Sequence, residues 1–125
     1  MCGICGIISF RSPEGLEDNL HLMLQSMQHR GTQESQCIKG NIAFGVRRLP
    51  IIDLYHSVQP IFNEDQSLLL IGNGQIYNYL ELRRELLQKG HKFRTNGDLE
   101  CILHLYEDYG NDIWNKLRGM WLFSV

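Results

Sequence analysis

The chain has 125 residues, of which 43% are hydrophobic and 21% charged, a composition typical of one soluble globular domain. Its formal net charge of −2 excludes the basic footprint of a nucleic-acid-binding protein. No apolar run approaches the ~20 residues that a bilayer span requires, and the N-terminus lacks the basic and apolar regions of a secretory signal. We therefore expect a cytoplasmic protein with reduced cysteines and with neither a membrane nor a nucleic-acid partner.

The first half of the chain predicts a strand, an amphipathic helix and a second strand. Residues Cys2 to Phe10 are short, glycine-punctuated and typical of a strand. Apolar residues at helical spacing from Leu16 to Met27 predict a helix that ends near His29. His29–Ser35 is expected to form a polar loop and Asn41–Val46 a strand. The Leu49–Asp53 segment is expected at an edge or turn, because its proline cannot donate to a ladder.

The middle of the chain predicts extended segments followed by a helix. Gln59-Pro60 begins an extended stretch, Asn63–Gln66 has turn residues, and Ser67–Gly72 reads as an apolar strand. Asn78, with a glutamate three residues later, resembles a capping box. It would begin a helix over Tyr79–Lys89, which the following glycine closes.

The last third predicts a short strand, a helix and a terminal strand. Phe93 is expected in the short strand, and Asp98 is expected to cap a helix that ends at Gly110. A last helical turn over 113–117 leads to a strand at Met120–Val125. Strands and helices mix without a clean βαβ alternation, so the expected fold class is α+β with antiparallel sheet.

Cys2 is the first candidate for chemistry. Removal of Met1 would leave one residue that carries both a thiol and a free α-amine. The amine could take the thiol proton, so no separate histidine base is required, and the thiolate would attack a carbonyl carbon. The structural alternative is a small buried cysteine near a chain start, which is the more common case for Cys2 taken alone.

Cys2 and Cys5 also have the spacing of a C-x-x-C pair. A redox pair of this kind normally precedes a helix N-terminus, whereas a strand is expected here. A zinc site would need a second ligand pair, but Cys37 and Cys101 are isolated in the sequence. No ligand cluster is expected among the histidines, and no metal site is predicted. The histidines are His21, His29, His56, His91 and His104.

Three further features have both a functional and a structural explanation. Gly72–Gln75 contains an Asn-Gly hairpin signal, yet amides displayed at a strand end are also what an oxyanion hole requires. Arg47 or Arg48 could hold a substrate carboxylate or lie in solvent. Asp98 could cap a helix or pair with the α-ammonium of an amino acid.

Together and in this order, these features closely resemble the class II glutamine amidotransferase domain of asparagine synthetases. The resemblance spans the whole chain in register and is far more specific than a single motif. The matching stretches are Met1–Ile7, His29–Gly31, Arg47–Asp53, Gln59-Pro60 with Asn63-Glu64, Asn73–Asn78, Leu82-Arg83 with Glu85-Leu86, Gly90-His91 with Phe93, Asp98 with Glu100, and Gly119-Met120.

The resemblance implies an N-terminal-nucleophile hydrolase fold, a four-layer α/β/β/α sandwich with antiparallel sheets. Residues 1–125 are expected to form a single, incomplete domain, because the family's domain continues beyond Val125 and supplies further strands. An incomplete sandwich exposes a sheet edge and part of its core, so poor solubility or marginal stability is expected for this chain alone.

The resemblance also implies roles for individual residues. Cys2 would attack the side-chain amide of glutamine, release ammonia and form a γ-glutamyl thioester that water hydrolyses. Arg48 would hold the substrate α-carboxylate, Asn73 and Gly74 would form the oxyanion hole, and Asp98 would pair with the α-ammonium. Further residues expected at the substrate pocket are Leu49, Pro50, Ile51, Ile52 and Gln75.

In full-length relatives the ammonia passes to a C-terminal domain that activates aspartate with ATP and Mg²⁺. Nothing in this chain resembles an ATP site, so no cofactor is expected here and both are expected only for that further domain. The expected partners are glutamine as substrate and a synthetase domain in cis or in trans. A homodimer is left open.

Two positions depart from the family. Gln75 stands where relatives usually have Glu near the substrate α-ammonium, and the loss of charge assistance predicts a raised glutamine KM. Thr32-Gln33 replaces Pro-Asp, so the loop loses a rigid proline and a carboxylate that could pair with Arg30. These positions leave open a non-catalytic remnant that binds glutamine or a partner protein. An amidotransferase serving a different amidation also stays open, because the further domain chooses the ammonia acceptor.

Overall fold

The computed structural model describes residues 2–53 and 55–125, and the expected removal of Met1 lies outside them. The strands are β1 (Gly3–Ile8), β2 (Gln33–Lys39), β3 (Ile42–Arg48), β4 (Ile61–Phe62), β5 (Leu69–Ile76) and β6 (Gly119–Ser124). The helices are α1 (Leu16–Ser26), η1 (Gln28–Arg30), α2 (Tyr79–Gln88), α3 (Glu100–Tyr109) and η2 (Gly110–Asn115). Within the described ranges, no helix combines the length and the hydropathy of a membrane span.

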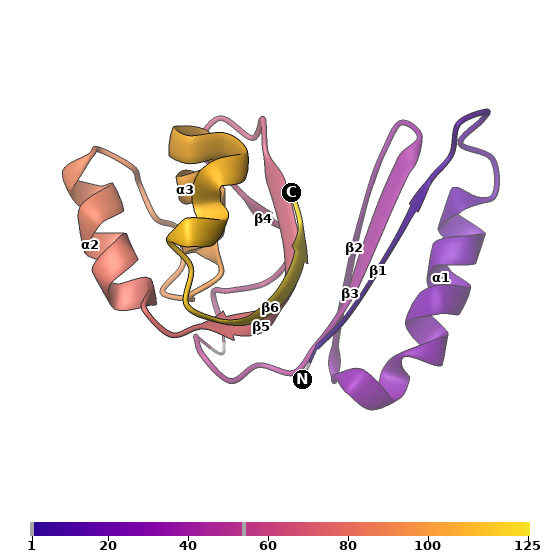
Figure 1. Cartoon of the computed structure of the whole chain (residues 1–125). Coiled ribbons are helices and arrows are strands. Elements are labelled where there is room, and N and C mark those ends of the chain that lie inside the picture. Colours follow the sequence, from indigo (N-terminus) through magenta and orange to yellow (C-terminus); the bar gives the residue numbers. More distant parts are fainter. Residues whose placement is uncertain (1, 54) are drawn as a thin grey trace.

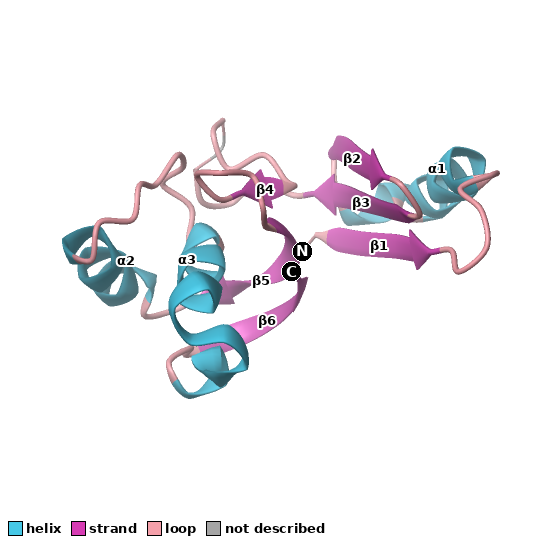
Figure 2. Ribbon diagram, turned by 90° about the horizontal axis from the view of Figure 1, so that it is seen from above, coloured by secondary structure: helices cyan, strands magenta, loops and turns pink. Residues whose placement is uncertain are grey.

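The described strands form two three-stranded antiparallel sheets, which Figure 2 shows from above. One sheet has the order β1-β3-β2 and the other the order β4-β5-β6. In Figure 1 the sheets lie face to face, with α1 outside the first sheet and α2 and α3 outside the second. The α+β class and the α/β/β/α layer order predicted from the sequence are therefore confirmed.

Each helical layer shares a hydrophobic core with the sheet that it covers. Leu20 and Leu24 of α1 are fully buried against Ala43 of β3. On the other side of the molecule, Leu86 of α2 packs with Ile76 of β5 in a larger core that includes α3. Complete burial of one such side chain contributes about 1.5–3 kcal/mol. The helical spacing of leucines in the sequence thus fixes each helix on its sheet.

The faces that the two sheets turn toward each other also carry apolar side chains. Ala43 and Ile7 face α1. Side chains alternate along a strand, so the adjacent residues Ile42 and Ile8 point toward the other sheet. These two residues are paired with each other between β3 and β1. Ile8 is 58% exposed, and Leu122 on the inner face of β6 is 65% exposed. Figure 1 shows the sheets closest beside the N-terminus and diverging away from it. Poor solubility stays a prediction, which this exposed apolar surface favours.

Two element predictions are wrong, and one strand is longer than predicted. Part of the expected polar loop is the strand β2, whose mostly exposed polar residues pair with β3. Phe93 is not in a strand but packs at the edge of the core around α3. Asn73-Gly74 forms no hairpin turn and lies inside β5, because β6 returns 45 or more residues later to pair with it. The expected strand over Ser67–Gly72 is therefore extended to Ile76.

The predicted capping box at Asn78 is also wrong. Asn78 occupies the N-cap position of α2, but its side chain makes no cap hydrogen bond. Its Nδ2 donates to the Lys116 carbonyl at 2.9 Å, and its Oδ1 accepts from the Arg118 N–H at 3.0 Å. Asn78 thus joins the start of α2 to the segment before β6. The closing glycines are confirmed, since Gly90 and Gly110 follow α2 and α3 with φ of 102° and 53°.

Candidate active site

A pocket of about 240 Å³ lies between residues of both sheets near the N-terminus. Every predicted site residue except Pro50 lines it; Pro50 is half-buried outside the lining. The predicted residues in the lining are Cys2, Arg48, Leu49, Ile51, Ile52, Asn73, Gly74, Gln75 and Asp98. Lining residues that sequence reasoning missed are Ser57, Gln59, Ile61, Gly97, Leu99 and Met120.

Cys2 lies just before β1, and its thiol faces the segment that follows β3. The Leu49 N–H donates to the Cys2 Sγ at 3.4 Å, and the Leu49 carbonyl oxygen lies 3.8 Å from the same sulfur. Arg30 Nη2 donates to the Cys2 carbonyl at 3.4 Å. Half-buried and held from two sides, Cys2 presents its sulfur at the pocket.

The other cysteines have different surroundings, although all four are free thiols. Cys5 is buried in the core beneath α1, and burial raises the pKa of its thiol. Cys101 is fully buried in α3, where burial raises the pKa of its thiol to about 12. Cys2 alone lines the pocket among the four, so the C-x-x-C spacing does not place two thiols in this site.

The guanidinium of Arg48 is buried and held by oriented acceptors. Its Nη1 donates to Gln33 Oε1 at 3.0 Å, and its Nη2 donates to the carbonyls of Ile52 and Asp53 at 3.1 and 2.7 Å. These three acceptors carry no formal charge, and together they fix the direction of the guanidinium. In this chain the side chain at position 33 therefore contacts Arg48.

Gly31 explains the close approach of the chain before β2 to β3. A Cβ at this position would lie 2.4 Å from the Arg48 carbonyl carbon and 2.8 Å from that of Arg47. Only glycine lets these two backbones meet without a shift. The glycine of the His-Arg-Gly motif is therefore explained by packing, because it lets the chain before β2 lie against the backbone of Arg48.

Asn73 and Gly74 border the pocket from within β5. The pairing with β6 places Asn73 opposite Leu122 on the face that points toward the other sheet. A Cβ at Gly74 would lie 2.3 Å from the Met120 carbonyl oxygen, so strand packing alone requires glycine there. Amide donors beside a thiol are the arrangement that an oxyanion hole needs.

Asp98 is buried and tied to the end of β5. Its Oδ2 accepts a hydrogen bond from the Ile76 N–H at 2.7 Å. The N-cap position of α3 belongs to Leu99 and has no side-chain cap bond, so the helix-cap explanation of Asp98 is wrong. Asp98 supplies an acidic group to the pocket opposite in sign to Arg48, a pair of charges that matches a zwitterionic amino acid.

Asp53 shapes the segment that holds Arg48, a role that the sequence did not predict. Its carboxylate accepts from the Asn96 N–H at 2.8 Å, the His56 N–H at 3.1 Å and the Ser57 hydroxyl at 3.1 Å. These hydrogen bonds, that of Asn96 above all, lower the pKa of the Asp53 carboxyl to about 2. The strongest of these contacts comes from Asn96, 43 residues away, so no local pattern could have indicated this role.

Gln59 anchors the pocket to β5. Its side chain is 3% exposed, its Nε2 donates to the Gly72 carbonyl at 2.9 Å, and its Oε1 accepts from the Gly72 N–H at 2.6 Å. A side-chain amide carries both a donor and an acceptor, so Gln59 satisfies both backbone groups of Gly72 at once. Gln59-Pro60 belongs to the stretches that resemble the family, but the residue pattern alone does not indicate that Gln59 is buried.

The expectation that the histidines form no ligand cluster is wrong. The rings of His91 and His104 lie 4.8 Å apart, and both face Glu64 and Glu107. The residues are 13 or more positions apart except within α3, so sequence spacing gave no sign of this cluster. It lies outside the pocket described above.

The chain thus combines facing sheets covered by helices with a pocket that one cysteine near the N-terminus lines. A family described as "Glutamine amidotransferase domain" matches residues 1–125, and the chain belongs to this family.

Related proteins extend well beyond the length of this chain. Asparagine synthetase [glutamine-hydrolyzing] 2 of Bacillus subtilis (strain 168) is 38% identical over 129 residues, which cover 100% of this chain and 17% of the relative. The asparagine synthetase of Asparagus officinalis is 40% identical over 127 residues, which cover 100% of this chain and 21% of the relative. The chain thus spans about a fifth of these relatives.

A solved structure supports the same fold. Glutamine phosphoribosylpyrophosphate amidotransferase from B. subtilis superposes with a TM-score of 0.73, covering 98% of this chain and 34% of that protein. The two sequences are 22% identical, so this likeness concerns the fold alone.

Proposed function

We propose that this domain hydrolyses the side-chain amide of glutamine through Cys2 and releases ammonia. The observation that carries the proposal is the convergence of Cys2, Arg48 and Asp98 on one pocket, although they come from distant parts of the chain. Membership of the glutamine amidotransferase domain family supports glutamine as the substrate.

The pocket suits a free amino acid. Arg48 offers its guanidinium to the α-carboxylate, and Asp98 offers its carboxylate to the α-ammonium. Leu49, Ile51 and Ile52 supply apolar walls for the methylene groups of the side chain. A substrate held at its α-end by two charges directs its side-chain amide toward the thiol, which is the positioning that the reaction requires.

The reaction proceeds in two halves. The free α-amine that Met1 removal exposes takes the proton of the Cys2 thiol, and the thiolate attacks the side-chain amide carbon. The oxyanion that forms is stabilised by the Asn73 side-chain amide and the Gly74 N–H. The C–N bond breaks, the protonated amine returns the proton to the nitrogen, and ammonia leaves a γ-glutamyl thioester. Water then cleaves the thioester to glutamate and the free thiol.

The direct test is to measure glutamate formed from glutamine by the chain and its variants. Cys2→Ala should abolish turnover, because Cys2 carries the only thiol among the described residues that line the pocket. Cys37→Ser, which removes another partly accessible thiol, is the matched control and should retain it. Equal loss in both variants, or turnover by Cys2→Ala, would contradict the proposal.

For the whole protein we propose asparagine synthesis in the cytoplasm. The relatives are named glutamine-hydrolysing asparagine synthetases, and residues 1–125 would be the single ammonia-producing domain of such a protein. A synthetase domain, in cis or in trans, would consume the ammonia to amidate aspartate with ATP and Mg²⁺. Adding such a domain should make glutamate formation rise when aspartate and ATP are present.

A second function, glutamine binding without hydrolysis, is favoured by one observation. Gln75 lines the pocket where the family usually places a carboxylate, and this weakens the charge complement for the α-ammonium. Calorimetry separates the two functions. Saturable glutamine binding by a chain that forms no glutamate would favour the binding protein, whereas turnover that depends on Cys2 would exclude it.

A further inference from the structure

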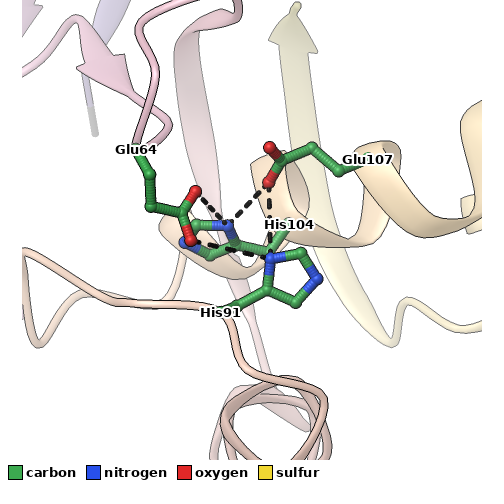
Figure 3. Close-up of side chains that lie close together, drawn as sticks. All are labelled: Glu64, His91, His104 and Glu107. Atoms are coloured by element: carbon green, nitrogen blue, oxygen red, sulfur yellow. Dashed lines mark hydrogen bonds and ion pairs between the residues drawn. The ribbon is translucent and has the colours of Figure 1, made fainter.

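A second group of polar side chains meets where three segments converge on α3. Glu64 comes from the turn after β4, His91 from the segment after α2, and His104 and Glu107 from one face of α3. Figure 3 shows the carboxylates and the ring nitrogens turned toward one another. One ligand atom of each residue lies within 4.8 Å of the others. We propose that these four residues bind one divalent transition-metal ion of the Zn²⁺ type.

The distances between the ligand atoms fit a tetrahedral ion. Nδ1 of His104 lies 2.8 Å from a Glu107 oxygen and 3.6 Å from a Glu64 oxygen. Nδ1 of His91 lies 3.5 and 3.8 Å from oxygens of the same two carboxylates. Ligands held at about 2.0–2.1 Å around Zn²⁺ are about 3.3–3.4 Å apart. The four nitrogen–oxygen distances lie within about half an ångström of this spacing, and the spread of the ligand atoms, up to 4.8 Å, would close as the side chains turn toward the ion.

The outward nitrogens of the two histidines also face carboxylates. Nε2 of His91 lies 3.1 Å from an Asp108 oxygen. Nε2 of His104 is buried without a hydrogen-bond partner, 3.8 Å from a Glu100 oxygen. Histidines that bind metals through one nitrogen usually donate the other N–H to such a carboxylate, which fixes the tautomer. An ion on Nδ1 would place the hydrogen of His104 on Nε2, toward Glu100.

The two glutamates are held in position by their neighbours. Asn63 donates to Glu107 Oε1 at 2.8 Å, and Oε2 of the same carboxylate faces the histidine rings. The Lys92 N–H donates to Glu64 Oε1 at 2.8 Å. The side chains of Glu64 and Glu107 are 33% and 25% exposed, whereas that of His104 is fully buried. The carboxylate side is therefore the route by which an ion enters from solvent.

The chemistry of the donors selects the ion. Imidazole suits Zn²⁺ and its neighbours in the first transition row, whereas Mg²⁺ and Ca²⁺ prefer oxygen ligands alone. Two neutral histidines and two ionised glutamates give a charge of −2, which a divalent ion balances. The ion would be structural, because it joins the turn after β4 and the segment after α2 to α3.

Titration of the full chain with Zn²⁺ by calorimetry, and with Co²⁺ by visible absorption, tests the site. We expect one ion per chain, a tetrahedral Co²⁺ spectrum without thiolate charge-transfer bands, and a higher Tm with Zn²⁺. The double variant His91→Gln/Glu107→Gln should lose saturable binding. Absence of stoichiometric binding, or a spectrum of thiolate ligation, would overturn the proposal.

A second pair of variants leaves all four proposed ligands in place, so that a loss of metal affinity is not confused with a loss of folding. Asp108→Asn removes the carboxylate behind His91, and such outer-shell losses weaken metal affinity about 10–100-fold. Asp108 also pairs with Lys89 at 2.8 Å, so Lys89→Met is the matched control that breaks this pair and leaves the His91 contact. Equal affinities of the two variants would contradict a metal site at these residues.

Discussion

The amide oxygen of Gln33 lies 3.0 Å from Nη1 of Arg48, so the first residue of β2 meets the last residue of β3 at the pocket. This acceptor carries no formal charge, and Arg48 is the residue proposed to bind the substrate carboxylate. Gln33→Glu would place a carboxylate there and compete with the substrate. We expect glutamine KM to rise about tenfold or more with little change in kcat, measured by steady-state glutamate formation.

A matched substitution separates this effect from a general change of charge. Gln36 lies on the same strand, is exposed and has no contact with Arg48 among its hydrogen bonds in the described structure. Gln36→Glu should leave KM unchanged. If both variants raise KM equally, the change arises from net charge and not from the Gln33–Arg48 contact.

Gln75 is expected to limit substrate affinity. It lines the pocket with Asp98, and an amide gives the α-ammonium a hydrogen bond without charge assistance. Gln75→Glu should lower glutamine KM by about fivefold, which corresponds to ~1 kcal/mol. Steady-state kinetics at pH 7 measures this directly. An unchanged or higher KM would refute the role given to this position.

The ionised carboxylate of Asp53 is expected to make the stability of the folded chain depend on pH in acid. The pKa of its carboxyl is lowered from 3.8 to about 2, so its contribution to the folded state is complete above the ordinary pKa. The contribution is then lost as pH falls from about 4 to about 2. Urea denaturation should show that Asp53→Asn is less stable than wild type above about pH 5, with the difference shrinking through this window. A difference that does not depend on pH would contradict the assignment.

Ser57→Ala serves as the graded control for Asp53. It removes one of the hydrogen bonds to the carboxylate, the 3.1 Å contact from the hydroxyl, and retains that from Asn96. Because the Asn96 contact contributes most, the acid transition should keep most of its size in Ser57→Ala. Loss of the whole transition would mean that the hydroxyl dominates.

A side chain added at Gly74 is expected to clash with the backbone of β6, whereas one added at Gly72, also in β5, has more room. A Cβ at Gly74 meets the Met120 carbonyl at 2.3 Å, whereas one at Gly72 has its nearest contact at 3.3 Å from the Phe123 side chain. Gly74→Ala should therefore destabilise the fold by about 1–3 kcal/mol more than Gly72→Ala. Chemical denaturation of both variants measures the difference. Equal stabilities would show that β6 moves aside without cost.

The sequence predicts the elements that bury regular apolar faces and misses those defined by distant partners. Leu20 and Leu24 recur at helical spacing, and α1 follows from them. The polar strand β2 has no such pattern, because it lies at a sheet edge with exposed side chains and is fixed by pairing with β3. Asn73-Gly74 has the local signal of a hairpin, which pairing with β6 overrides.

The residues of the candidate site also divide into those that the sequence indicates and those whose roles depend on distant contacts. The positions of Cys2, Arg48 and Asp98 at one pocket follow from the resemblance, which already contains the fold. The hydrogen bond from the Ile76 N–H to Asp98, which excludes a helix cap, depends on the meeting of β5 with the start of α3. The cluster around His104 joins residues from three segments, so no local spacing could indicate it.

Covalent capture of Cys2 tests the central claim most directly. The chain would be treated with an electrophilic analogue of glutamine, and the modified residue identified by peptide mass spectrometry. Modification at Cys2 alone is expected, with protection by glutamine and loss in Cys2→Ala, since Cys5 and Cys101 are buried with thiols of raised pKa. Modification at Cys37, or labelling of Cys2 that glutamine does not slow, would contradict a glutamine-binding nucleophile at this pocket.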